Sequence, residues 1–201
     1  MIKLIIFDAH GVIFKGGYVA TARALSRRLS IPYERVYEVM YTKYVNRAAL
    51  REITQTEAWT RTIQDLSLPL TIKELRNLHY SLLSVNKPIL HCAKRLKNKY
   101  RIIILTKNMR SQWADTRVLF PEVWKVFGSK NMINTWEYRL PKAKSETMYF
   151  LCQRFRVKPE EMLYIDDQEA NLKEPKRMGA RTILYKNVGD AIARIYKVCG
   201  G

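Results

Sequence analysis

The chain contains four short runs of mostly apolar residues, one near its start and three in its second half. They cover residues 4–7, 101–105, 162–165 and 182–185. Apolar runs of this length without polar alternation are typical of strands buried on both faces of a parallel sheet. Polar residues follow the first three runs directly, namely Asp8, Thr106 and the pair Asp166-Asp167. The pattern therefore predicts buried parallel strands that present polar side chains at one end.

Helical patterns lie between these runs. One begins at Pro88, a favoured first residue of a helix, and another covers residues 145–155 with apolar residues on one face. The alternation of strands and helices predicts an α/β fold with a Rossmann-like, doubly wound parallel sheet. Ligands bind at the carboxyl ends of the strands in such sheets, so Asp8, Thr106 and the paired acids fall where a site is expected.

Residues 15–87 show no convincing buried strand. They contain four amphipathic helical patterns, over 18–29, 32–46, 54–66 and 71–85. Thr54 with Glu57, and Thr71 with Glu74, have the spacing of capping boxes at helix starts. We therefore expect a small all-helical cap over residues 15–87, inserted after the first strand of a core formed by residues 1–14 and 88–201. A cap of this kind can close over a site, exclude water and select the substrate.

Length and composition limit the class of protein. With 201 residues, 47% of them hydrophobic, the chain can bury one core and a modest accessory lobe. No apolar run approaches the roughly 20 residues that span a bilayer, so we expect no membrane association. Residues 1–8 are too short and too soon charged for a secretory signal. The three cysteines are far apart and lack CxxC spacing, which favours free thiols in a reducing cytoplasm.

The charge is strongly basic, with 36 Lys and Arg residues against 18 Asp and Glu residues and a net charge of +18. Such a surface attracts polyanions and steers anionic substrates. Basic residues are densest over 94–101 and 139–144. Two interpretations remain open: a solvated basic face, or contact with nucleic acid or another polyanion. The sequence does not determine the oligomeric state.

The polar residues after the strands form a chemically coherent set. Carboxylates bind hard cations through oxygen, and a cation with a lysine can neutralise a phosphoryl group so that another carboxylate attacks it. The residues that supply this set are Asp8, Thr106, Lys144, Asp166 and Asp167.

Four segments resemble the motifs of the haloacid dehalogenase superfamily. Phe-Asp-Ala-His-Gly-Val-Ile at 7–13 resembles its first motif, a strand followed by DxDG[TV][LI], and Leu-Thr-Lys-Asn at 105–108 resembles the second. Lys-Ser-Glu at 144–146 stands where the third motif has Lys-Pro-Asp/Glu, and residues 164–171 match the fourth, a hydrophobic pair followed by Asp-Asp-x-x-x-Asn. The resemblance covers nearly the whole chain. Residues 50–59 also resemble cap segments of the subgroup with bacterial glucose-1-phosphate phosphatases and epoxide hydrolase N-terminal domains.

The resemblance implies an Mg²⁺-dependent phosphatase that acts on a small phosphorylated metabolite. Asp8 would be the nucleophile that forms an aspartyl-phosphate. The metal ligands implied are Asp8, the backbone carbonyl of His10, and Asp166 or Asp167. The residues implied to bind the phosphoryl group are Thr106, Lys107, Asn108 and Lys144, with Lys142 as a competing candidate for the place of Lys144. Asn171 either orients the acidic loop or caps a helix.

His10 departs from the first motif, because the family usually has an acid/base Asp there. Three interpretations stay open. His10 can serve as the acid/base, since its ordinary pKa lies near neutrality, although nearby carboxylates would raise that pKa and Mg²⁺ would lower it. It can instead merely fill space while turnover is slow, or the chain can be a binding protein that has kept the fold.

Two other classes of function remain as alternatives. A catalytically weak or inactive protein would use its basic surface to bind nucleic acid or a ribonucleoprotein, and a phosphatase acting on nucleic-acid ends would combine both features. A haloacid dehalogenase would share the Phe-Asp-Ala-x-Gly pattern, but the resemblance implies that such enzymes use no metal and lack the paired acids, so Asp166-Asp167 weighs against it.

Overall fold

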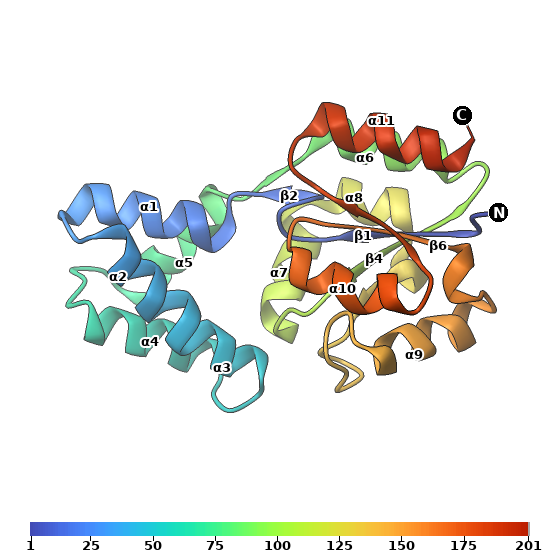
Figure 1. Cartoon of the computed structure of the whole chain (residues 1–201). Helices are drawn as coiled ribbons and strands as arrows, with labels where there is room; N and C mark the ends of the chain where they lie inside the picture. The colour runs from blue at the N-terminus through green and yellow to red at the C-terminus, as the bar shows by residue number, and fades with distance from the viewer. Residues whose placement is uncertain (201) are drawn as a thin grey trace.

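A five-stranded parallel sheet forms the centre of the computed structural model, which describes residues 1–200 (Figure 1). Its order is β5-β4-β1-β6-β7. The strands are β1 (Leu4–Asp8), β4 (Arg101–Thr106), β5 (Met132–Asn134), β6 (Met162–Asp166) and β7 (Arg181–Leu184). In the middle of the sheet, Ile6 of β1 pairs with Ile103 and with Tyr164. The predicted doubly wound parallel sheet is confirmed, and the three-residue edge strand β5 is the one that the apolar runs did not show.

Helices cover both faces of the sheet, which explains the unbroken apolar runs. Ile5 and Phe7 point into one core, while Leu4 and Ile6 point into the other. The first face is covered by α6 (Lys87–Leu96), α8 (Pro121–Phe127) and α11 (Val188–Cys199). The second is covered by α9 (Ser145–Phe155) and α10 (Glu169–Arg177). Short 3₁₀ turns, η2 (Ser129–Asn131) and η3 (Pro159–Glu161), precede β5 and β6. Every position of the central strand is thus buried by one layer or the other.

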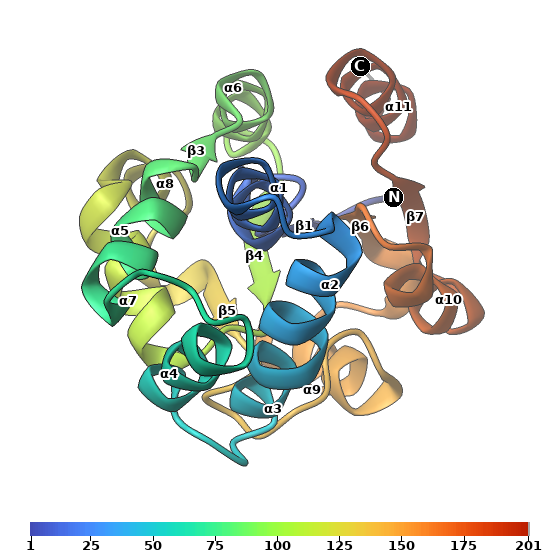
Figure 2. The ribbon, with the colours of Figure 1, turned by 90° about the vertical axis from the view of Figure 1, so that its left-hand side faces the viewer.

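The helices after β1 form a separate layer with its own apolar core, seen face-on in Figure 2. They are α1 (Gly17–Leu29), α2 (Tyr33–Tyr37), the π-helix η1 (Glu38–Val45), α3 (Asn46–Ala49), α4 (Gln55–Asp65) and α5 (Ile72–Ser81). Trp59 lies in the middle of this layer with only 2% of its surface exposed. We keep the name cap for residues 15–87, and the exact division of the chain stays a prediction.

Three details of the cap differ from the sequence pattern. The continuous helix expected over 32–46 changes to π-helical hydrogen bonding at Glu38, because periodicity does not distinguish i→i+4 from i→i+5 bonds. The helix expected to reach residue 85 ends at Ser81. Thr71 and Glu74 form the full capping box, whereas Thr54 accepts from the Glu57 backbone N–H without the return bond.

Two short strands carry the chain between core and cap. β2 (Phe14–Lys15) pairs antiparallel with β3 (Ser84–Val85), so the outgoing and returning segments lie side by side. Asn86 then fixes the return, since its backbone N–H donates to the Ile13 carbonyl over 2.8 Å and its side chain donates to the Val12 carbonyl over 2.8 Å. The expectation that residues 15–87 are helical throughout is therefore corrected at both ends of the segment.

Helix α7 (Arg110–Leu119) brings the core into contact with the cap. Arg76 of the cap donates to both oxygens of Asp115 at 2.6 Å, and the Tyr80 hydroxyl donates to the same carboxylate. Met109 packs in an apolar cluster with Tyr44 and other cap residues. The cap is thus held against the core at the carboxyl end of β4. Among the helices within residues 1–200, none has the length and apolar character needed to cross a membrane.

Candidate active site

The carboxyl ends of the three central strands bring the sequence-predicted polar residues together. Asp8, Thr106 and Asp166 end β1, β4 and β6, and β1 lies between the other two. All three side chains are buried, with 2%, 3% and 0% of their residue surface exposed. Asp167 follows Asp166, and carboxylate oxygens of Asp8, Asp166 and Asp167 lie within 4.8 Å of one another. The strands therefore create a compact acidic cluster at one edge of the sheet.

Lys142, and not Lys144, is the lysine of this cluster. Its Nζ lies 2.7 Å from Asp8 Oδ1 and 3.0 Å from Asp166 Oδ2. Lys144 is exposed and precedes the first residue of α9. Between the two, Ala143 is buried in a left-handed conformation (φ 54°), which sends the neighbouring side chains to different sides of the loop. The assignment of Lys144 to the nucleophile is thus corrected in favour of the competing candidate.

Gly11 leaves the space that Asp167 occupies. Its φ of +97° lies in the region that favours glycine, and a Cβ there would overlap the Asp167 carboxylate. The turn after β1 closes here, with the Gly11 N–H donating to the Phe14 carbonyl over 2.8 Å. The glycine is thus required both by the backbone and by the third acid of the cluster.

A hydrogen-bond network holds the Asp166 carboxylate in one orientation. The Tyr164 hydroxyl donates to Oδ2 over 2.8 Å, and the Gln168 backbone N–H donates to Oδ1 over 2.8 Å. The Asn171 amide donates to both oxygens, at 3.0 and 3.2 Å. Of the two interpretations of Asn171, orientation of the acidic loop agrees with this geometry, because Gln168 and not Asn171 stands at the start of α10.

Burial opposes negative charge at this cluster. It raises the pKa of Asp8 to about 7, although Lys142 acts in the opposite direction. Burial, together with the neighbouring Asp166, also raises the pKa of Asp167. Three carboxylates and one lysine thus leave the cluster short of positive charge. A hard divalent cation would supply that charge, and oxygen ligands at this separation are of the type that Mg²⁺ prefers, so the donor set fits the metal.

His10 lies beside the cluster as a neutral ring. Burial, reinforced by the charge of Lys142, lowers its pKa to about 4. Its Nε2 lies 2.9 Å from Asn108 Nδ2, and because an amide nitrogen only donates, Nε2 accepts and the ring proton lies on Nδ1. Asn108 is itself held by Asn134, which accepts from its backbone N–H and donates to its carbonyl at 2.9 and 2.8 Å. Strand β5 thus positions the partner of His10.

A cavity of about 450 Å³ opens between this cluster and the cap. The sequence-predicted residues that line it are Asp8, His10, Thr106, Lys107, Asn108, Asp167 and Asn171, together with Lys142. Lys107 is a second lysine in the lining, beside Thr106, and burial lowers its pKa. Lys144 is outside it. The site is therefore closed on one side by the strand ends and on the other by the cap.

Several residues that shape the site were not singled out by the sequence. Tyr37 and Tyr41 line the cavity from the cap, and Gln112 lines it from α7. The only signal for Tyr37 and Tyr41 was the helical pattern over 32–46, which does not tell which turn faces the core, and Gln112 had no signal in the sequence. Asn134 had a weak signal of its own, since it ends an apolar pair in the same way as Asp8 ends β1.

Comparisons with known proteins agree with this arrangement. A curated relative, the bifunctional epoxide hydrolase 2 of Rattus norvegicus, is 27% identical over 139 residues, which cover 67% of this chain and 25% of that protein. The chain thus spans about a quarter of the length of this curated relative. The relative is named an epoxide hydrolase, and residues 50–59 resemble cap segments of the subgroup that includes epoxide hydrolase N-terminal domains.

Solved structures show the same fold. A predicted HAD-like family hydrolase from Porphyromonas gingivalis superposes with a TM-score of 0.74 at 20% identity, covering 98% of both chains. A HAD family enzyme from Bacteroides thetaiotaomicron, solved in complex with magnesium and inorganic phosphate, gives a TM-score of 0.71 at 18% identity, covering 92% of this chain and 95% of that one. A family model for the haloacid dehalogenase-like hydrolases matches residues 2–179. The chain belongs to the haloacid dehalogenase-like hydrolases.

Proposed function

We propose that this protein is an Mg²⁺-dependent phosphomonoester hydrolase that acts through an aspartyl-phosphate on Asp8. The observation that carries the proposal is the convergence of Asp8, Asp166 and Asp167 within 4.8 Å, with Lys142 2.7 Å from Asp8. A carboxylate can attack an anionic ester only where the charge of both groups is neutralised, and this is the environment that the cluster offers. The solved relative from Bacteroides thetaiotaomicron, which binds magnesium and phosphate, supports the same chemistry.

Each residue then has a part in the reaction. The Asp8 carboxylate would attack phosphorus, and the Ala9 N–H and Lys142, which both donate to Oδ1 at 2.7 Å, would hold its orientation. Thr106 would donate its hydroxyl to a phosphoryl oxygen. Lys142 would also stabilise the charge of the transferred group. Lys107 and Asn108, which follow the carboxyl end of β4, would bind the substrate.

Mg²⁺ would be held by Asp8, the backbone carbonyl of His10, and Asp166 or Asp167. When bound, it would supply positive charge to the nucleophile and to the phosphoryl oxygens. Asn171, Tyr164 and the Gln168 N–H already fix the Asp166 carboxylate without it. Because the metal ligands in such sites depend on the groups that orient them, these three partners are part of the proposed metal centre.

His10 would not donate a proton to the leaving group at neutral pH. A neutral imidazole whose Nε2 accepts from Asn108 has its remaining proton on Nδ1, and that proton is only weakly acidic. Of the three interpretations of this residue, slow turnover of esters that need an acid agrees best with its surroundings. The leaving group would then have to be stable as an anion or be protonated by water.

Hydrolysis of p-nitrophenyl phosphate with and without Mg²⁺ tests the proposal, with Asp8→Asn as the control variant. We expect Mg²⁺-dependent turnover that the variant loses while its melting temperature stays nearly unchanged. Activity that survives Asp8→Asn would overturn the mechanism. Release of halide from 2-chloropropionate without Mg²⁺, faster than any phosphatase activity, would instead favour the dehalogenase alternative.

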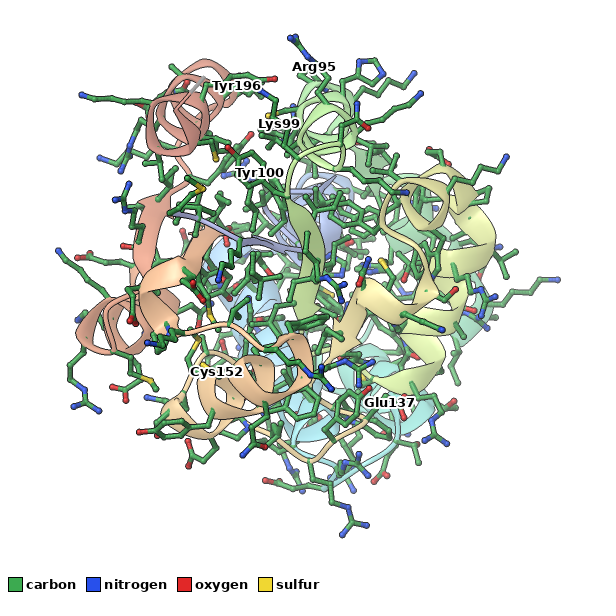
Figure 3. All side chains as sticks on the ribbon, turned by 90° about the vertical axis from the view of Figure 1, so that its right-hand side faces the viewer. Arg95, Lys99, Tyr100, Glu137, Cys152 and Tyr196 are labelled. Carbon is green, nitrogen blue, oxygen red and sulfur yellow. The ribbon has the colours of Figure 1, made fainter. Side chains whose placement is uncertain are left out.

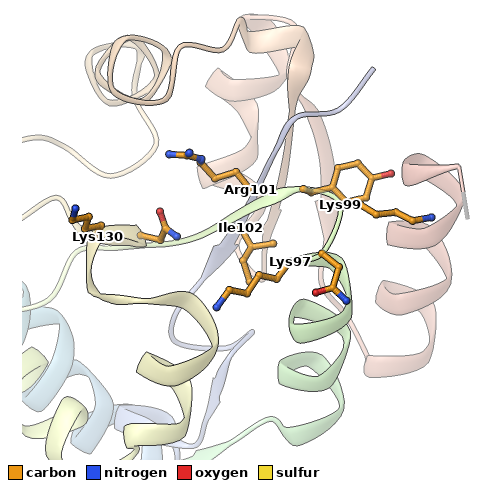
Figure 4. A pocket seen from close by; sticks show the side chains of 8 residues that line it. Lys97, Lys99, Arg101, Ile102 and Lys130 are labelled. Carbon is orange, nitrogen blue, oxygen red and sulfur yellow. The ribbon is translucent and has the colours of Figure 1, made fainter.

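A second candidate function rests on a basic cleft at the opposite end of the sheet (Figure 4). Lys97, Lys99, Arg101 and Lys130 line this cleft of about 540 Å³, and within residues 1–200 none of the four forms an ion pair. Its lining, over the same residues, has no Asp or Glu. Figure 3 shows Lys99 near the end of the molecule that also carries Arg95, which stacks on Tyr196. Unpaired cations of this kind suit a phosphate-bearing polyanion.

Retention of single-stranded RNA at about 50 mM salt tests this second candidate. Arg101 begins β4 and Thr106 ends it, so the cleft and the acidic cluster are roughly 16 Å apart along one strand. We expect Lys97→Glu with Lys130→Glu to abolish retention and to leave p-nitrophenyl phosphate hydrolysis unchanged. Retention that persists in this double variant would show that the cleft is not the binding surface.

A further inference from the structure

The two walls of the active-site cavity differ sharply in chemical character. All the charged residues in its lining come from the core, namely Asp8, Lys107, Lys142 and Asp167. Over the described residues, the cap contributes no charged side chain to this lining. This is unusual in a chain with 36 basic and 18 acidic residues. The phosphoryl end of a substrate would therefore meet the core, and the leaving group would meet an uncharged wall.

The uncharged wall is aromatic at its centre. Tyr37 and Tyr41 stack with ring centroids 5.1 Å apart and planes at 29°, and the Tyr18 ring packs against Tyr41 with centroids 5.3 Å apart. All three rings line the cavity. The π-helix η1 carries Tyr41, and such segments are frequent at functional sites because they change which side chains face a neighbour. The three rings thus form an aromatic surface on the cap side of the cavity that Asp8 lines from the core.

Aliphatic residues extend the wall to the rim of the cavity. Val19, Val45, Ala49 and Leu50 line it, and Asn46 is the one amide that the cap adds to the lining over the described chain. Leu50 is 58% exposed and Val19 is 38% exposed, although both are apolar. Exposed apolar side chains beside a cavity are typical of a surface that a ligand covers.

A hydroxyl-rich leaving group would find only the tyrosine hydroxyls and the Asn46 amide as hydrogen-bond partners on this wall. Each buried hydroxyl needs a hydrogen-bond partner, and burying it without one costs about 1–3 kcal/mol. A leaving group with several charges, such as the rest of a nucleic-acid strand, would need cations that the cap does not provide. An aromatic ring, by contrast, gains both from apolar burial and from contact with the three tyrosine rings.

We propose that the site takes phosphate monoesters whose leaving alcohol or phenol carries an otherwise uncharged aromatic ring, which Tyr18, Tyr37 and Tyr41 receive. This inference rests on the proposed function, because it names the ester class for the same site. Tyr41 is then the main specificity-determining residue, since its ring contacts both of the others and lies in the middle of the wall.

Binding of phosphonates, which cannot be hydrolysed, tests the wall independently of the chemistry. Calorimetry with Mg²⁺ present would compare benzylphosphonate, cyclohexylmethylphosphonate and ethylphosphonate. We expect benzylphosphonate to bind about tenfold or more tighter than ethylphosphonate, because it buries a ring. The saturated ring should bind about 2- to 10-fold more weakly than the aromatic one, because it cannot stack. Equal affinity for all three would overturn the proposal.

Substitutions of single tyrosines test whether the preference for a ring comes from the aromatic wall. Tyr41→Leu should weaken benzylphosphonate binding about 3- to 10-fold and leave ethylphosphonate binding unchanged, whereas Tyr41→Phe should keep the preference for the ring. Tyr33→Leu is the matched control, because Tyr33 stacks on Tyr37 at 5.8 Å but does not line the cavity. Melting temperatures would show whether each variant is folded. An unchanged ring preference in folded Tyr41→Leu would contradict the role of Tyr41.

Hydrolysis of acetyl phosphate separates the two proposals. Its leaving group has no ring and needs no acid, so its turnover depends on the residues around Asp8 and on the metal, and not on the aromatic wall. Turnover of acetyl phosphate without any preference among the phosphonates would overturn the aromatic wall and leave the phosphatase standing. A preference for benzylphosphonate without turnover of acetyl phosphate would uphold the wall and contradict the proposed catalysis.

Discussion

The imidazole of His10 and the side-chain amide of Asn108 meet at 2.9 Å, so the residue at the usual acid position accepts a hydrogen bond through Nε2. An aspartic acid at this position would present a protonated oxygen to the leaving group instead. The contact links the turn after β1 to the loop after β4, and Asn134 holds that loop in place. It has a direct consequence for which esters the protein can cleave.

Without a strong acid at position 10, the rate should fall steeply as the pKa of the leaving alcohol rises. We expect His10→Asp to raise turnover of alkyl phosphates relative to p-nitrophenyl phosphate by about 10²-fold, the lower end of what general acids contribute. The measurement is kcat for a series of leaving groups in both proteins. A loss in the variant that grows with the pKa of the leaving alcohol would show that His10 itself donates the proton.

Lys142 and Lys144 give a matched pair of variants. Lys142→Met removes the cation that lies 2.7 Å from Asp8 and should lower kcat for p-nitrophenyl phosphate by about 10²-fold or more. Lys144→Met removes an exposed cation two residues away and should change kcat by less than about twofold. The reverse order of effects would restore Lys144 as the lysine of the third motif.

Gly11→Ala should damage the metal centre more than the fold. The added Cβ would displace Asp167, so we expect affinity for Mg²⁺, measured by calorimetry, to fall about tenfold or more. Gly128→Ala is the control, because Gly128 also has a positive φ (+79°) but a Cβ there meets nothing within 4 Å. Both variants should lose roughly 1 kcal/mol of stability from backbone strain. Equal Mg²⁺ affinity in the two would exclude Asp167 as a ligand.

The buried side chain of His79 should make the free energy of unfolding depend on pH. The Thr21 hydroxyl donates to the Gly17 carbonyl and therefore accepts from His79 Nδ1, while Nε2 is buried without a partner in the described chain. Burial lowers the pKa of His79 to about 3, so the unfolded chain binds a proton more readily than the folded one. Stability should thus be fully present above pH 6.5 and decrease as the pH falls toward 3.

The loss from this one residue should be about 2 kcal/mol between pH 6.5 and pH 5, at about 1.4 kcal/mol per pH unit. Urea unfolding at both values of pH would measure it. His79→Phe should reduce the difference between them, and substitution of the exposed His91 by Gln serves as the control. A difference that is the same in His79→Phe as in the original protein would contradict the prediction.

The sequence predicted the central strands well because each is buried on both faces, so an apolar run and a polar end coincide in Asp8, Thr106 and Asp166. It did not predict β5, since three residues are too few to show a pattern. The position of Lys142 in the cluster depends on the left-handed backbone conformation of Ala143. The sequence does not predict that conformation, because left-handed backbone is expected mainly at glycine. The π-helical segment that carries Tyr41 was hidden because eight residues are too few for apolar spacing to distinguish a π-helix from an α-helix.

The pairing of β2 with β3 makes the cap a module that can be exchanged. Phe14 and Val85 face each other across the two antiparallel strands, so the core is already closed at the point where the intervening residues leave and return. A change in the length or sequence of that insertion adds little loop-closure entropy to the core. Substrate preference can therefore diverge within residues 16–83 while the catalytic sheet keeps its sequence, and chimaeras that graft another insertion between these two strands are a direct route to new specificities.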